Sequence, residues 1–197
     1  MSIRPIYLYG SDVLRAKAKP VKQLTDDIVK LYVDMISTMH NAPGIGLAAN
    51  QVGALDRVLV IDMGAVEESE SGETEEETVS KSPKPVKSLI VINPEILKSD
   101  GTEVMEEGCL SIPDLRADVE RPDEIRLRFR DANFKEVELE AKGLLARVLQ
   151  HEIDHLDGVL FFDHISKTQR ALLKPKLSKI KKGDVEASYP VVTGVEV

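Results

Sequence analysis

The chain has 197 residues, of which 42% are hydrophobic, and a formal net charge of −8, which suits one soluble domain with a real core and excludes a broad basic face for nucleic acid. No stretch approaches the roughly 18 consecutive apolar residues of a membrane span, and the N-terminus lacks the apolar run and cleavage site of a signal peptide. Cys109 is the one cysteine and cannot form an internal disulfide, so we expect a reducing, cytoplasmic location.

Residues 1–24 are expected to be extended and irregular, because prolines and glycines interrupt them. A helix is predicted next, with Thr25 as N-cap and Asp26 and Asp27 in the first turn, where the helix dipole favours acids. Residues 41–44, Asn-Ala-Pro-Gly, end it. The apolar stripe of this helix is Ile28, Leu31, Tyr32, Met35 and Met39, and we interpret its methionines as core filling.

A glycine-rich stretch follows that helix. Residues 44–53 read Gly-Ile-Gly-Leu-Ala-Ala-Asn-Gln-Val-Gly, and glycines allow a backbone to approach a ligand closely. A tight loop packed against the core is the alternative, and the phosphate-loop pattern is absent. The apolar run at residues 58–61 then predicts a buried strand.

The stretch from 64 to 86 has a different composition from the rest of the chain. It is rich in glutamate, then in lysine and proline, and offers almost nothing apolar to bury. We predict an exposed, mobile acidic surface insertion between two strands, and a solvated loop is favoured over a functional acidic patch.

Further strands are predicted on both sides of a polar loop. Residues 89–92 are apolar and are expected to end at Asn93-Pro94. Residues 125–129 and 137–141 alternate between apolar and polar side chains around a turn at 131–133, which predicts a hairpin with one wet face.

The strongest chemical signal is H-E-x-x-H at residues 151–155, in a segment whose apolar spacing predicts a helix from Gly143. Residues four apart lie on one helix face, so His151 and His155 can hold one divalent cation. Glu152 is rotated by about 100°, which lets it take a proton from a metal-activated water without ligating the metal.

A catalytic site of this kind needs a third ligand. Phe161 stands where one known pattern has a third histidine, and the downstream acids at 163, 184 and 186 are not in a convincing helix. Cys109 lies upstream in a polar loop, and a thiolate with two imidazoles leaves one position open for water.

The rest of the chain is predicted to close the domain. Residues 159–162 form a short buried segment, and residues 167–182 form a basic amphipathic helix that Pro175 kinks or restarts. Its apolar side holds Leu172, Leu173, Leu177 and Ile180. We expect one catalytic domain over residues 1–182, and a flexible C-terminal tail over residues 183–197.

Three motifs occur in a fixed order: Gly-Ile-Gly-Leu-Ala-Ala-Asn-Gln at 44–51, Glu-Gly-Cys-Leu-Ser at 107–111 and His-Glu-Ile-Asp-His at 151–155. In this order the chain closely resembles the peptide deformylases, from about Asp12 to the basic C-terminal helix. The resemblance implies an α+β fold in which antiparallel and mixed β-sheets surround a central helix carrying H-E-x-x-H.

The resemblance also implies a function. Members remove the formyl group from the N-terminal formylmethionine of newly synthesised polypeptides and release formate. It implies one Fe²⁺ ion per chain, which Ni²⁺, Co²⁺ or Zn²⁺ can replace, N-formylmethionyl nascent peptides as partners and a transient association with the ribosome.

Residue roles carried over by the resemblance cover all three motifs. Cys109, His151 and His155 match the metal ligands, and Glu152 matches the general base for attack by the metal-bound water on the formyl carbonyl. Gln51 and the backbone N–H of Leu110 match the oxyanion-stabilising groups. Substrate-binding positions are Ile45, Gly46, Glu107, Leu144 and Val148, with Met105 near the methionine pocket and Arg116 as polar partner of Glu107.

Two departures from the family pattern stand out. The acidic stretch 64–86 has no counterpart in compact members, and Arg147 occupies a usually apolar helix position, which leaves the edge of the methionine pocket open. Two other functions stay as alternatives: an H-E-x-x-H metallo-endopeptidase, and a metal-binding protein without catalysis. The missing downstream ligand counts against the first, and intact Glu152 and Gln51 count against the second.

Overall fold

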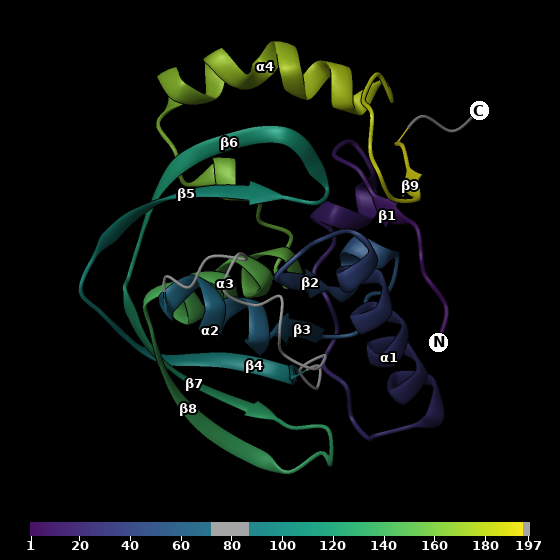
Figure 1. Ribbon diagram of the computed structural model, residues 1–197, viewed down its shortest axis with the longest axis vertical. Coiled ribbons are helices and arrows are strands. Elements are labelled where there is room, and N and C mark those ends of the chain that lie inside the picture. The colour runs from purple at the N-terminus through teal and green to yellow at the C-terminus, as the bar shows by residue number, and fades with distance from the viewer. Residues whose placement is uncertain (72–86, 195–197) are drawn as a thin grey trace, which may run out of the picture.

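The computed structural model describes residues 1–71 and 87–194, and within them the fold is α+β (Figure 1). A five-stranded antiparallel sheet has the order β2-β3-β4-β7-β8, a two-stranded antiparallel sheet pairs β5 with β6, and β1 pairs in parallel with β9. The strands are β1 (Ile6–Tyr7), β2 (Gly46–Ala48), β3 (Val58–Asp62), β4 (Ser88–Asp100), β5 (Glu103–Cys109), β6 (Ile112–Arg121), β7 (Glu124–Arg130), β8 (Glu136–Lys142) and β9 (Val191–Val192).

Helix α1 (Asp26–Asn41) is confirmed with its predicted start. The Thr25 side chain accepts a hydrogen bond from the backbone N–H of Ile28, which satisfies one of the free donors of the first turn. Met35 and Met39 are fully buried in the main core, so the methionines fill core space as interpreted, whereas Tyr32 of the same stripe is only partly buried.

The predicted buried strand at 58–61 is confirmed as β3, but β4 does not end at Asn93-Pro94. The strand continues to Asp100, with a register shift between Ile92 and Glu95. Asn93 has a positive φ of 55°, and the shift places Pro94, which has no N–H, where the ladder is interrupted. The hairpin of β7 and β8 is confirmed, with Ile125, Leu127 and Phe129 buried.

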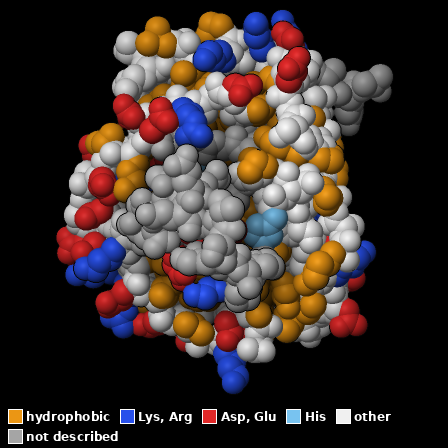
Figure 2. Space-filling view, in the orientation of Figure 1, with side chains coloured by type: hydrophobic (Ala, Val, Ile, Leu, Met, Phe, Trp, Pro, Cys, Tyr) orange, Lys and Arg blue, Asp and Glu red, His pale blue; other side chains and the backbone are white. Residues whose placement is uncertain are grey.

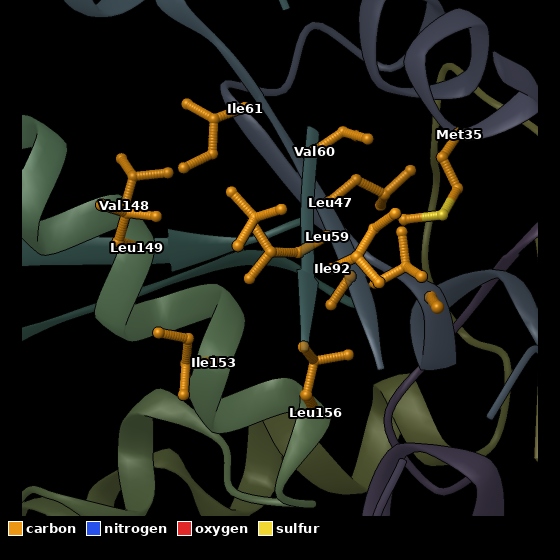
Figure 3. Packing of buried hydrophobic residues seen from close by; sticks show 14 of the residues in the cluster. Met35, Leu47, Leu59, Val60, Ile61, Ile92, Val148, Leu149, Ile153 and Leu156 are labelled. Atoms are coloured by element: carbon orange, nitrogen blue, oxygen red, sulfur yellow. The ribbon is translucent and has the colours of Figure 1, made fainter. Parts of the chain in front are cut away.

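Helix α3 (Gly143–Leu156) lies at the centre of the fold, between the β5–β6 hairpin and the five-stranded sheet (Figure 1). Val148, Leu149, Ile153 and Leu156 face the buried side chains of the sheet, including Leu59 of β3 (Figure 3). Burying several such side chains at roughly 1.5–3 kcal/mol each holds the H-E-x-x-H helix rigidly in place.

The acidic segment begins with a helix that we did not predict. Helix α2 (Met63–Ser71) starts directly after β3, and Val66 in its second turn is buried in the core. The first residues of the expected insertion are therefore packed, and the remainder, 72–86, lies outside the described residues. Whether that remainder is mobile stays a prediction.

The C-terminal region departs most from expectation. Helix α4 (Lys167–Lys181) continues through Pro175 without a break. It buries Leu177 and Ile180 and leaves Leu172 exposed. The segment expected to be a loose tail instead returns to the body of the protein and forms β9 beside β1. Figure 1 shows β1 and β9 on the same side of the molecule.

The face of the molecule shown in Figure 2 carries acidic and basic side chains close together. In the described part of the chain, no helix has the length and apolar character needed to cross a bilayer.

Candidate active site

Two elements far apart in sequence bring three metal-ligating side chains together. Cys109 ends β5, while His151 and His155 lie one turn apart on α3. One ligating atom from each of the three lies within 4.8 Å of the others, and Cys109 Sγ is 3.1 Å from His155 Nε2. The three residues predicted as ligands are therefore neighbours.

The ring of His151 is oriented by a buried carboxylate. Glu107 accepts from His151 Nδ1 at 2.9 Å, and its two oxygens also accept from Arg121 at 2.7 and 3.1 Å. Burial raises the pKa of Glu107, but the hydrogen bonds from His151 and Arg121 outweigh it and hold the pKa far below its ordinary value. The bond to Nδ1 leaves Nε2 of His151 facing Cys109 and His155.

Arg147 completes this charged cluster. Its guanidinium donates to Glu107 Oε1 at 2.9 Å and to the backbone carbonyls of Val119 and Glu103 at 2.8 and 2.6 Å. The guanidinium is thus hydrogen-bonded to residues of the β5–β6 hairpin, although Arg147 also borders the cleft. Its place on α3 follows from sequence, but its direction does not.

The predicted pairing of Glu107 with Arg116 is wrong. Arg116 is exposed and lies 3.5 Å from Glu106, on the other face of β5. Glu107 is buried, and His151, Arg121 and Arg147 together occupy both of its carboxylate oxygens. Glu107 therefore orients His151, and neither of its oxygens is left free for a further polar contact in the cleft.

Within residues 1–71 and 87–194, no carboxylate orients the buried ring of His155. Its Nδ1 is buried without a hydrogen-bond partner among the described residues, and Asn50 donates to its backbone carbonyl. Burial, together with the positive charge at His151, lowers the pKa of His155 well below its ordinary value. The imidazole is therefore neutral, which is the form that binds a metal.

Glu152 lies beside the ligands, pressed against the glycine-rich stretch. A Cβ on Gly46 would lie 2.5 Å from Glu152 Oε1 and 2.9 Å from a Val148 methyl carbon, so this position requires glycine. Burial raises the pKa of Glu152 to about 7, and its Oε2 has no partner among the described residues. An unpartnered buried carboxylate oxygen facing a cleft is available to a reacting proton.

Gln51 comes to the same point from the other wall. Its side-chain oxygen accepts from the backbone N–H of Ala48 at 2.8 Å, which fixes the amide and directs Nε2 to Ser111 Oγ at 3.2 Å and Cys109 Sγ at 3.6 Å. Leu110 lies between these two loop residues. The predicted amide donors are thus adjacent to the three ligand atoms.

These groups open into a cleft of about 600 Å³. Ile45, Gly46, Leu144 and Val148 line it as predicted, whereas Met105 does not. The far wall is formed by Glu186–Tyr189, a segment that sequence reasoning assigned to a tail. The cleft therefore has apolar walls and also contains the polar side chains of Cys109, Gln51, His151 and Glu152.

The residues present fit a divalent metal. One soft thiolate and two imidazoles with converging atoms are a ligand set for a borderline transition metal. Burial lowers the pKa of His151, but hydrogen bonds with Cys109 and Glu107 raise it well above its ordinary value. The surroundings thus favour a positive charge at this point, which a bound cation supplies.

Sequence reasoning missed several residues that support the site. Arg121 ends β6 and donates to Asp154 at 2.6 Å as well as to Glu107, and no motif marks it. Ser111 belongs to the Glu-Gly-Cys-Leu-Ser motif and could have been identified there as the acceptor for Gln51. Tyr189 gives no signal in the sequence.

Comparisons with known proteins agree with this geometry. The family model described as "Polypeptide deformylase" matches residues 3–171. The peptide deformylase of Salinibacter ruber is 50% identical over 97% of this chain and 95% of its own length, and that of Chlorobium limicola is 46% identical over 99% and 98%.

Solved structures give the same result for the fold. A peptide deformylase from Legionella pneumophila superposes with a TM-score of 0.77 at 36% identity, covering 93% of this chain and 98% of its own. One from Ehrlichia chaffeensis in complex with actinonin gives 0.77 at 34% identity, covering 94% and 100%. On the combined evidence of sequence and fold, the chain belongs to the polypeptide deformylase family.

Proposed function

We propose that this chain removes the formyl group from the N-terminal formylmethionine of new polypeptides and releases formate. The observation that carries the proposal is the convergence of Cys109, His151 and His155 with Glu152 and Gln51 at the mouth of one cleft. The reaction is inferred from the matched family, and the cleft contains the groups that this reaction needs.

The proposed metal is Fe²⁺, which Ni²⁺, Co²⁺ or Zn²⁺ can replace, held by Cys109, His151 and His155. When bound, the cation supplies Lewis-acid activation of a water molecule and of the formyl carbonyl. Glu107 holds the His151 ring in the orientation that leaves Nε2 for the ligand position.

Proton transfer is proposed for Glu152. Its carboxylate accepts a proton from the attacking water and returns it to the leaving amine, so that the C–N bond breaks with formate and a free amino terminus as products. Gly46 leaves room for the carboxylate at this position, because any side chain there would meet Oε1.

Two hydrogen-bond donors, the Gln51 amide and the Leu110 backbone N–H, are proposed to stabilise the negative charge that develops on the formyl oxygen. Gln51 cannot rotate freely, since its oxygen is held by Ala48 N–H at 2.8 Å. A donor fixed before the reaction needs no reorganisation when charge develops.

Binding of the methionine side chain is proposed for the apolar wall of Ile45, Leu144 and Val148. The backbone of Gly46 is proposed to pair with the substrate strand, because the residue has no side chain to obstruct it. Glu107 is proposed as a positioning residue rather than a substrate contact.

The direct experiment measures formate release from formyl-Met-Ala-Ser, beside digestion of casein and metal analysis of the same preparation. We expect formate release, intact casein and one metal equivalent per chain. Cys109→Ser is expected to lose metal, because a neutral hydroxyl replaces a thiolate. A serine variant with tightly held metal and normal activity would contradict the three-ligand site, and casein cleavage would favour an endopeptidase.

Transient ribosome association is proposed as the setting in which nascent chains are met. Co-sedimentation with ribosomes tests it, and a deformylating enzyme that stays in the supernatant at low salt would contradict it.

A further inference from the structure

The loop that follows β5 is hydrogen-bonded to residues near both ends of the sequence, which the sequence analysis did not predict. Residues 109–111 carry the Cys109 thiol and the Ser111 hydroxyl, which both contact Gln51 at the site described above, and the Leu110 amide lies between them in the chain. Gln51 donates to Ser111 Oγ at 3.2 Å, and the backbone N–H of Tyr9 donates to the Ser111 carbonyl at 2.8 Å.

The third support of this loop is Tyr189. Its hydroxyl donates to the backbone carbonyl of Leu110 at 2.8 Å, across 79 positions of sequence. The ring is half-buried and packs against the main core. Burial, with the negative charges of Cys109 and Asp114, raises the pKa of Tyr189 to about 12, so the hydroxyl keeps its proton at neutral pH.

The segment that presents Tyr189 is itself firmly placed. Immediately after it, the carbonyls of Pro190 and Val192 accept from the N–H groups of Ile6 and Leu8 at 2.9 and 2.8 Å. Gly194 then packs on the backbone of Gly10, where a Cβ would lie 2.5 Å from the Gly10 carbonyl group. The N-terminal segment 6–9, which supplies Tyr9, is thus the segment that fixes the position of Tyr189.

We infer that Tyr189 is a positioning residue of the active site, and that the C-terminal segment 186–192 belongs to the catalytic structure rather than to a tail. The hydrogen bond to the Leu110 carbonyl restrains the peptide plane between Leu110 and Ser111, and through the Leu110 backbone it limits the neighbouring plane that carries the Leu110 N–H and follows Cys109. The catalytic part of this inference rests on the proposed deformylase function.

The test compares Tyr189→Phe with Tyr32→Phe. Each change removes one hydroxyl from a partly buried ring, but Tyr32 lies on α1 and its hydroxyl has no hydrogen bond among the described residues. For both variants and the unaltered protein we would measure kcat and KM on formyl-Met-Ala-Ser, melting temperature, and hydrogen–deuterium exchange of residues 109–111.

We expect Tyr189→Phe to lower kcat per folded enzyme and to speed exchange at 109–111, each by roughly 2- to 10-fold, as one lost hydrogen bond implies. KM should not change, because the hydroxyl is hydrogen-bonded to the loop and is therefore not free to bind the substrate. Tyr32→Phe should match the unaltered protein in every measurement.

Two patterns would overturn the inference. If only KM rises, the segment is a wall of the cleft and does not position the loop. If only the melting temperature falls, with kcat and exchange unchanged, Tyr189 is a stabilising residue and nothing more. Faster exchange without a change in kcat also contradicts it, because the reaction then does not use the restraint.

Failure of the proposed function gives a separate result. An unaltered protein that releases no formate would remove the deformylase proposal, and the exchange comparison would still decide whether Tyr189 orders residues 109–111. A second variant with a stop codon after Asp184 removes the whole segment. We expect it to exchange faster at 109–111 than Tyr189→Phe does, and equal exchange to the unaltered protein would contradict the inference.

Discussion

His151 and His155 lie one turn apart on the same helix and face the same point, but their surroundings differ in kind. His151 is held through its ring by Glu107, which is in turn held by Arg121 and Arg147. His155 has no hydrogen bond to its Nδ1 among the described residues; it is placed by its helix and by Asn50 at its backbone carbonyl, while its Nε2 lies 3.1 Å from Cys109 Sγ. One imidazole is therefore oriented by charge and the other by burial.

The difference teaches that the charged cluster has two tasks. It orients a ligand, and it joins α3 to the β5–β6 hairpin, which carries Cys109 at its end. The His155 side needs neither, because α3 already packs on the five-stranded sheet there. Changes on the two sides should therefore differ in size and in what they affect.

The largest expected effect lies between the two sides, at Glu152. Glu152→Ala should keep the metal, since all three ligands remain, and lose roughly 10²–10⁴-fold in turnover, the usual contribution of a general base. Metal analysis and formate release on the same sample measure it. Full metal content with near-normal turnover would remove Glu152 from the mechanism.

On the His151 side, Glu107→Gln should break the charged cluster. It leaves the buried Arg147 guanidinium without a counter-charge and Arg121 with Asp154 alone, and breaking a buried ion pair costs about 3–5 kcal/mol of unfolding free energy. Losing the partner of His151 should also weaken metal affinity by roughly 10- to 100-fold. Denaturant melts and a metal titration measure both, and unchanged affinity would mean that Glu107 serves only the hairpin.

Arg147→Met is a milder break on the same side. Glu107 keeps Arg121 and His151, so the expected loss is about 1.5–3 kcal/mol, the usual range for hydrogen bonds to a charged group. Methionine fits a similar space, and affinity for the metal should fall less than in Glu107→Gln. A metal affinity as low as that of Glu107→Gln would show that Arg147, and not Arg121, holds the carboxylate in place.

On the His155 side, Asn50→Ala should have a smaller effect. It removes a hydrogen bond to a backbone carbonyl rather than to the ring, with an expected loss of about 1 kcal/mol of unfolding free energy. Metal affinity should stay within twofold of the unaltered protein. A loss of affinity comparable to that of Glu107→Gln would end the distinction between the two ligands.

The smallest effect is expected far from both histidines. Replacing residues 72–84 with a short Gly/Ser linker keeps α2 and its buried Val66, and surface loops cost little to close. Stability should change by less than about 0.5 kcal/mol, and activity should not change. A large fall in melting temperature would show that the acidic stretch packs on the domain.

Sequence alone identified the parts of the protein that local pattern determines. Thr25 predicted the start of α1, alternation predicted the β7–β8 hairpin, and the spacing of His151 and His155 predicted a shared face. These features depend on residues within a few positions of one another. The three ordered motifs then predicted which residues form the candidate site, since each motif is short and distinctive.

The remaining features depend on contacts that no local pattern records. The direction of the Arg147 side chain is set by carbonyls of β5 and β6 that lie dozens of residues away. Pro94 looked like the end of a strand, but a bulge accommodates it within β4. Strands β1 and β9 have two residues each and show no periodicity, so their pairing across the length of the chain could not be predicted.

The parallel pairing of β1 with β9 has a consequence for how the molecule is made. A chain synthesised from its N-terminus has β2–β8 and α3 long before residues 189–192, so β1 waits without its partner while the core forms. During that interval the loop at 109–111 lacks the Tyr189 hydrogen bond. Residues 189–192, which are made after the other parts of the site, would then complete it, and an enzyme proposed to act on unfinished chains would itself need this late segment before its loop at 109–111 is fully ordered.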